Sequence, residues 1–183
     1  MPIIYQSQTG TTDDGYVAMQ SQPTWASARD GAGNIKSTAL AQYSAGTSVT
    51  RVSGRRGSNL YTVIRSFFCF DTSGVTSAVS AATIKIRGYS TNTGSVIAVK
   101  STTVYGPQKT TTNWSTSGYN DFTGTSDLLT DMQNNDVVII CLMDYTNDYL
   151  NVALTSDVNL RCGMYYAEAS SDPSATYDPK IDY

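Results

Sequence analysis

The chain has 183 residues, of which 40% are apolar and only 15% are charged, with a formal net charge of −3 and no histidine. The length fits one globular domain, and the weak net charge excludes the concentrated cationic face of a nucleic-acid-binding protein. The lack of histidine excludes Ser-His-Asp and Cys-His catalysis and removes the commonest transition-metal ligand.

Alternating apolar and polar residues dominate the chain, and this period of two predicts strands with one buried face. Turn-rich segments such as "SGRRGSN" and "STNTGS" separate the apolar runs. In chain order, we expect strands at 3–8, 15–19, 48–53, 60–70, 83–90, 95–101, 136–143, 149–154, 158–166 and 177–182.

Helical signals are few. The segment "TSDLLTDMQNND" predicts one short helix, capped by Thr125 or Ser126. The segment "TSAVSAAT" is compatible with either a helical turn or a loop. We therefore predict an all-β fold, an antiparallel β-sandwich or jelly roll with about ten short strands and little helix. It forms a single domain over residues 1–183, with a long polar loop at 101–127.

Two strands are apolar on both faces, namely "LYTVIRSFFCF" and "DVVIICLMD". A sandwich strand normally turns one face to water, so these predict a second cover. The cover is the 101–127 loop, a terminal segment or another subunit. In "SFFCFDTS" the phenylalanines fill the core, and Asp71 ends the strand by accepting backbone N–H groups.

The chain ends and the cysteines indicate how the protein is made. Cys69, Cys141 and Cys162 have apolar neighbours and no C-x-x-C pairing, which predicts buried free thiols. The start "MPIIYQSQTG" has no signal-peptide pattern, so we expect synthesis in a cytoplasm. No run reaches the ~18 apolar residues of a transmembrane helix, so we expect no membrane partner. The end "DPKIDY" predicts a terminal strand with Ile181 inward and Asp182 outward.

Several segments resemble a known module in their order along the chain: "TTDDGYV", "SFFCFDTSGV", "AATIKIRGYS", "WSTSGYNDF" and "YYAEASSDPSATYDPKIDY". Together they resemble the DNRLRE-type β-sandwich domains and their relatives in bacteriophage structural proteins, although the DNRLRE signature itself is absent. This resemblance implies a jelly-roll-like sandwich that occurs in phage virions, surface polymers and large extracellular enzymes. Some related modules bind polysaccharide, and no shared catalytic residues come with the resemblance.

Candidate metal sites are two pairs of carboxylates. Asp13 and Asp14, or Asp144 and Asp148, offer the oxygen ligands that Ca²⁺ takes, but the same residues are typical of turns, which we favour. No paired general acid and base and no phosphate-binding loop is present, so we expect no other cofactor and no enzyme activity. The "GRRG" segment could contact an acidic partner subunit, but we favour a solvated loop.

Candidate glycan-stacking residues are Trp114, Tyr119, Tyr145 and Tyr149, because aromatic side chains at a surface supply contact area with one wet edge. Trp114 has an alternative role, which is to pin the 101–127 segment over the sheet.

Two functional hypotheses follow. The first is a non-enzymatic bacteriophage virion protein, a capsid decoration, head-fibre or tail component made in the host cytoplasm. Its partners are other virion proteins and itself, as a homo-oligomer. The alternative is a carbohydrate-binding module or adhesin that recognises a cell-surface glycan. A carboxylate-based glycan hydrolase ranks third, because no pair of carboxylates is marked out.

Overall fold

The computed structural model describes residues 2–5, 15–38, 49–92, 94–165 and 177–183. The helical elements are α1 (Trp25–Asp30), η1 (Thr111–Asn113, a 3₁₀ turn), α2 (Ser126–Asn134) and η2 (Tyr145–Tyr149, a π-helical turn). The strands are β1 (Ile3–Tyr5), β2 (Gly15–Gln22), β3 (Ile35–Thr38), β4 (Val49–Gly57), β5 (Leu60–Asp71), β6 (Thr83–Asn92), β7 (Ser95–Lys100), β8 (Thr103–Thr110), β9 (Tyr119–Thr123), β10 (Val137–Asp144), β11 (Val158–Tyr165) and β12 (Lys180–Asp182). Within these described ranges, no helix is long and apolar enough to cross a membrane.

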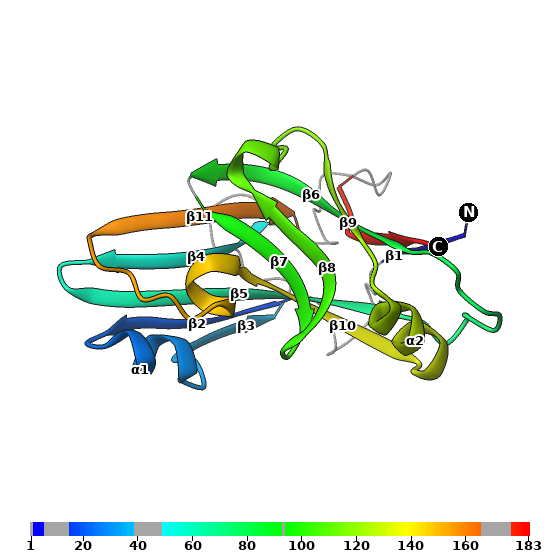
Figure 1. Cartoon of the computed structure of the whole chain (residues 1–183), viewed down its shortest axis with the longest axis horizontal. Helices are drawn as coiled ribbons and strands as arrows, with labels where there is room; N and C mark the ends of the chain where they lie inside the picture. Colours follow the sequence, from blue (N-terminus) through cyan, green and yellow to red (C-terminus); the bar gives the residue numbers. More distant parts are fainter. Residues whose placement is uncertain (1, 6–14, 39–48, 93, 166–176) are drawn as a thin grey trace.

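The strands build a two-layered antiparallel β-sandwich, which confirms the predicted fold class (Figure 1). One layer runs β3-β2-β5-β10-β7-β8, and the other contains β9, β6, β11 and β4 together with β12 and β1. The long strand β5 joins them, because its first half pairs with β4 and its second half pairs with β10. The two described chain ends lie side by side, where β1 pairs with β12.

The main core lies between the two layers and receives alternate residues of each strand. Phe68 and Phe70 of "SFFCF" point into it, which explains the density of phenylalanine in this stretch. Each such ring stabilises the fold by about 1.5–3 kcal/mol when it is fully buried. The largest fully buried side chains of this core are Phe68, Phe70, Ile84, Ile86, Tyr105, Phe122, Leu128, Met132, Ile140 and Leu142.

A second, smaller core lies under α1, a helix that the sequence analysis did not predict. Trp25 packs there with Ala28 and Val63, and the indole Nε1 donates to Asn151 Oδ1 at 3.0 Å. The helix begins at the N-cap Thr24, whose hydroxyl accepts from the backbone N–H of Ser27 at 3.1 Å. A helix of six residues is too short to show a helical pattern in the sequence. So short a helix is not stable by itself, and the Thr24 cap and the packing of Trp25 stabilise it.

Three sequence-based expectations are wrong. The "GRRG" segment is not a loop, because it forms the end of β4 and pairs with the start of β5. Residues 101–127 are not a long loop, because they contain β8, η1, β9 and the start of α2. "TVYGPQKT" and "YNDFT" carry too few apolar residues to show alternation, yet Tyr105 and Phe122 anchor them in the main core. Residues 149–154 are not a strand, because η2 ends there and Leu150 and Val152 are exposed.

Other expectations are confirmed. Helix α2 begins after the N-cap Thr125, and "TSAVSAAT" is irregular up to the start of β6. Asp71 ends β5 by accepting from the backbone N–H of Ser73 at 3.0 Å and from its hydroxyl at 2.6 Å, bonds that lower the pKa of Asp71. The three cysteines are free and buried.

The C-terminal strand is also confirmed. It covers Lys180–Asp182, directly after Pro179, and it lies between β1 and β6. Ile181 is fully buried in the main core, as expected, whereas Asp182 does not face open solvent: its side chain is only 17% exposed and approaches Lys85 at 3.7 Å.

Candidate binding cavity

A cavity of about 630 Å³ opens on the outer face of the β5–β10 layer, on the side away from the main core. Residues from five parts of the chain surround it. They are Arg29, Asp30, Arg65, Phe67, Ser101, Thr102, Cys141, Met143, Asp148 and Tyr149.

The floor of the cavity follows from the strands that are apolar on both faces. Phe68 and Leu142 point into the main core, so their neighbours Phe67, Cys141 and Met143 point outward. Phe67 and Cys141 are register partners across the β5–β10 pair. A second cover exists here, but most of it was not among the expected ones: Tyr145 and Tyr149 of η2 pack against this apolar cluster, and only Val104 comes from the 101–127 segment.

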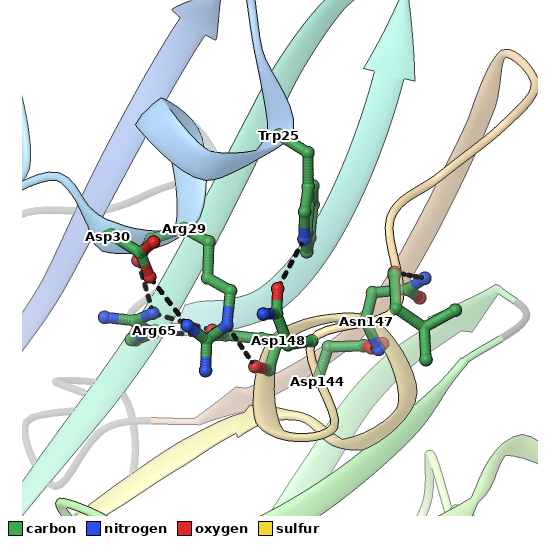
Figure 2. Close-up of polar contacts among 9 residues, drawn as sticks. Trp25, Arg29, Asp30, Arg65, Asp144, Asn147 and Asp148 are labelled. Carbon is green, nitrogen blue, oxygen red and sulfur yellow. Dashed lines mark hydrogen bonds and ion pairs between the residues drawn. The ribbon is translucent and has the colours of Figure 1, made fainter.

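The charged wall of the cavity is an ion-pair cluster around Asp148. Arg65 donates to both carboxylate oxygens of Asp148, from Nε at 2.7 Å and from Nη2 at 2.6 Å. Arg29 donates from Nε to the backbone carbonyl of Asp148 at 2.8 Å and from Nη1 to Asp30 at 2.6 Å. Figure 2 shows Arg29 reaching from α1 and Arg65 from β5 toward the η2 coil.

This cluster is tightly held because Asp148 is only 2% exposed. The two hydrogen bonds between Arg65 and the Asp148 carboxylate raise the pKa of Arg65, and burial opposes this shift. A buried carboxylate needs such pairing, since the cost of removing it from water is several kcal/mol. The arginines therefore hold η2 against α1 and β5.

The π-helical turn η2 places Asp148 and Tyr149 on the cavity wall. The turn begins where the Asp144 carboxylate accepts from the backbone N–H of Asn147 at 2.6 Å. Burial raises the pKa of Asp144, partly offset by this bond. The rings of Tyr145 and Tyr149 stack with centroids 5.8 Å apart, and the Tyr149 hydroxyl donates to the Thr102 carbonyl at 3.4 Å.

The structure gives the predicted metal residues other roles. Asp148 is engaged by the arginines, and Asp144 caps η2, which is the turn role that the sequence analysis favoured. Outside the masked segments, no three His, Cys, Asp or Glu side chains gather in a metal-binding group. Asp13 and Asp14 lie outside the described residues.

The four predicted glycan-stacking residues do not form one platform. Trp114 is only 5% exposed and belongs to the main core, so it pins its segment over the sheet, as the alternative interpretation held. Tyr119 lies on β9, where its hydroxyl donates to the Asp178 carbonyl at 2.9 Å and the Lys180 ammonium lies 4.9 Å from its ring centroid. Of the four, Tyr149 alone lines the cavity.

The sequence analysis did not single out Arg29 and Arg65, although one signal was present. Arg65 interrupts the apolar run "TVIRSFF", and a charge inside such a run indicates a buried partner. That partner is 83 residues away in the chain.

The chemistry of the lining groups favours binding through non-covalent contacts. Cys141, on the floor of the cavity, carries a thiol that could act as a nucleophile. Burial raises the pKa of this thiol to about 12, so it stays protonated at neutral pH. Both carboxylates of the lining are paired with arginine. The wall thus offers guanidinium donors, and the floor offers apolar contact area.

A scan of protein-family models finds no match to this chain, and a search of curated proteins finds none either. The resemblance to DNRLRE-type modules stays a prediction based on the motifs quoted above.

Proposed function

We propose that the chain is a non-enzymatic structural component of a bacteriophage virion that assembles through the outer face of β10. The observation that carries this proposal is an apolar row on that face. Val137 is 48% exposed and Ile139 is 52% exposed, while their neighbours Val138 and Ile140 are buried in the main core. The next outward-facing residue on β10 is Cys141, which is buried with Met143 beside Tyr145 and Tyr149 of η2.

The exposed apolar side chains of Val137 and Ile139 lie on the same face as the covered Cys141. Their exposure supports assembly with a second copy of the chain or with another virion protein. Each Å² of apolar surface removed from water contributes about 25 cal/mol to such a contact. Ile139 is the register partner of Cys69 on β5, whereas Val137 lies opposite the exposed Asp71, so the row is apolar around Ile139 and bordered by one carboxylate. The resemblance to phage structural modules supports the same function.

The test is the oligomeric state of the purified chain and of one substituted form. We expect an oligomer by size-exclusion chromatography with light scattering, and a shift toward monomer in Ile139→Lys. The matched control is Val152→Lys, because Val152 is 48% exposed but lies in the irregular segment after η2. A wild-type monomer at high micromolar concentration that does not associate with phage particles would contradict the proposal. So would an oligomer that Ile139→Lys leaves unchanged.

A second candidate function, recognition of a cell-surface glycan, is favoured by the position of Tyr149 on the cavity wall. Aromatic and apolar lining with a few polar groups is typical of small-ligand sites. A glycan array, read with and without a chelator, tests this function and any role of Ca²⁺. Silence on every glycan would contradict it.

A further inference from the structure

The cavity wall carries guanidinium N–H groups that have no partner among the described residues. A guanidinium has five N–H donors and no acceptor. Arg29 uses Nε and Nη1, and Arg65 uses Nε and Nη2, for contacts within the protein. Arg29 Nη2 and Arg65 Nη1 make no hydrogen bond with the described residues, and both side chains line the cavity. A ligand that satisfies this wall must bring acceptors.

The lining holds two arginines and two aspartates, so its formal charge is balanced, and the free guanidinium N–H groups are what it offers to a ligand. Asp148 is sequestered between the arginines, and its two oxygens already accept from Arg65. Asp30 is exposed and is paired with Arg29. A carboxylate offers two charged acceptor oxygens for these free N–H groups on Arg29 and Arg65, which makes it the favoured acceptor.

The remaining surfaces suit a ring with one apolar face. Phe67 and Met143 form an apolar floor, and Tyr149 stands beside it. Ser101 and Thr102, from the turn between β7 and β8, add hydroxyl and carbonyl groups at the rim. A pyranose presents C–H groups on one face and hydroxyls around its edge, and the volume of about 630 Å³ lies within the usual range of small-ligand cavities.

We propose that this cavity binds a carboxylated sugar residue, with the carboxylate on the free N–H groups of Arg29 and Arg65 and the ring on Phe67, Met143 and Tyr149. This inference rests on the glycan-binding function and is independent of virion assembly. It names the class of glycan: one with a uronic or similar acidic sugar.

The direct test follows the methyl group of Met143 by NMR in protein labelled at the methionine methyls. Three probes are titrated: methyl glucuronide, methyl glucoside (the same ring without the carboxylate) and acetate. We expect methyl glucuronide to shift Met143 while Met132 and Met164, which lie in the main core, stay in place. Methyl glucoside and acetate should each bind at least about tenfold more weakly than methyl glucuronide, because the first lacks the carboxylate and the second lacks the ring.

Arg29→Gln tests the guanidinium contact without breaking the fold, because Asp148 keeps both hydrogen bonds from Arg65. We expect methyl glucuronide to bind this variant about tenfold more weakly. Arg56→Gln is the matched control, since Arg56 bonds Asn59 and the Thr155 carbonyl away from the cavity, and its affinity should equal that of the wild type. Unchanged Met132 and Met164 signals show that each variant is folded.

The possible outcomes separate this inference from the function on which it rests. If methyl glucoside shifts Met143 as tightly as the glucuronide does, glycan binding stands and the acidic ligand class is overturned. If acetate alone binds as tightly, the sugar part is overturned. If no sugar shifts Met143, both the inference and the glycan function at this cavity fail. An unchanged affinity in Arg29→Gln also overturns the inference.

Discussion

Replacing Arg65 by Met tests the ion-pair cluster that holds η2 in place. The substitution keeps an unbranched apolar stem of similar shape but removes both donors to the Asp148 carboxylate, at 2.7 and 2.6 Å. The nearest remaining cationic nitrogen is Arg29 Nε, which lies 3.9 Å from Asp148 Oδ1 and already donates to the backbone carbonyl. A carboxylate that is 2% exposed is then left almost without compensation.

We expect this substitution to lower the free energy of unfolding by about 3–5 kcal/mol, the usual cost of breaking a buried ion pair from one side. For a domain of this size, the melting temperature falls by roughly 10 °C. Urea unfolding followed by circular dichroism measures the free energy, and a thermal scan measures the midpoint. The control is Arg56→Met: its ion-pair partner Asp157 is exposed at 3.4 Å and its hydrogen bonds go to Asn59 and the Thr155 carbonyl, so no buried charge is left behind and the loss should be clearly smaller.

The double variant Arg65→Met with Asp148→Leu separates pairing from packing. Because it leaves no buried charge, it should recover part of the stability that Arg65→Met loses. A loss below about 1 kcal/mol in Arg65→Met would refute the reasoning. The same holds if the double variant is less stable than Arg65→Met alone, because the arginine would then act mainly through packing.

Three further predictions concern the sandwich itself. Gly88→Ala places a Cβ 1.8 Å from the Ser115 carbonyl oxygen, so we expect a loss of about 1–3 kcal/mol in urea unfolding. Tyr105→Phe removes the hydroxyl that donates to Asp131, at a cost of about 1–2 kcal/mol at neutral pH. Hydrogen bonds from Lys100 and then Tyr105 lower the pKa of Asp131, so this contribution is present above its ordinary pKa of 3.8 and is lost as the pH falls through the lowered value. Deleting residues 177–183 removes the strand between β1 and β6, and we expect it to abolish soluble folding.

Each of these predictions has its own control or contradicting result. Gly74→Ala should be nearly neutral, because no atom lies within 4 Å of the added Cβ. A Tyr105→Phe deficit that stays constant from neutral pH to acid would argue against the bond to the ionised carboxylate. A truncated chain that stays soluble and melts cooperatively near the full-length temperature would contradict the role of the terminal strand.

The sequence by itself predicted the buried faces of the strands that have clear alternation, and several of their turns. The alternation in "TIKIRGYS" predicted that Ile84 and Ile86 are buried, and Asp71 was recognised as the end of its strand. The segment "TSDLLTDMQNND" predicted α2, with Thr125 or Ser126 as its start, and the helix begins after Thr125. These features depend on neighbours within a few residues, so a local pattern is sufficient to predict them.

Only the tertiary structure decided which segments meet. Strands β8 and β9 have weak alternation, and each is stabilised by one aromatic anchor whose neighbours come from other strands. The strand predicted at 149–154 is instead the end of η2 and an irregular segment, held by contacts of Arg65 and Trp25 with Asp148 and Asn151 from 83 and 126 residues away. A local pattern contains no information about such distant partners, so the cavity that they build was not predictable from periodicity. Its walls form where long-range ion pairs and packing outweigh the local preference for a strand.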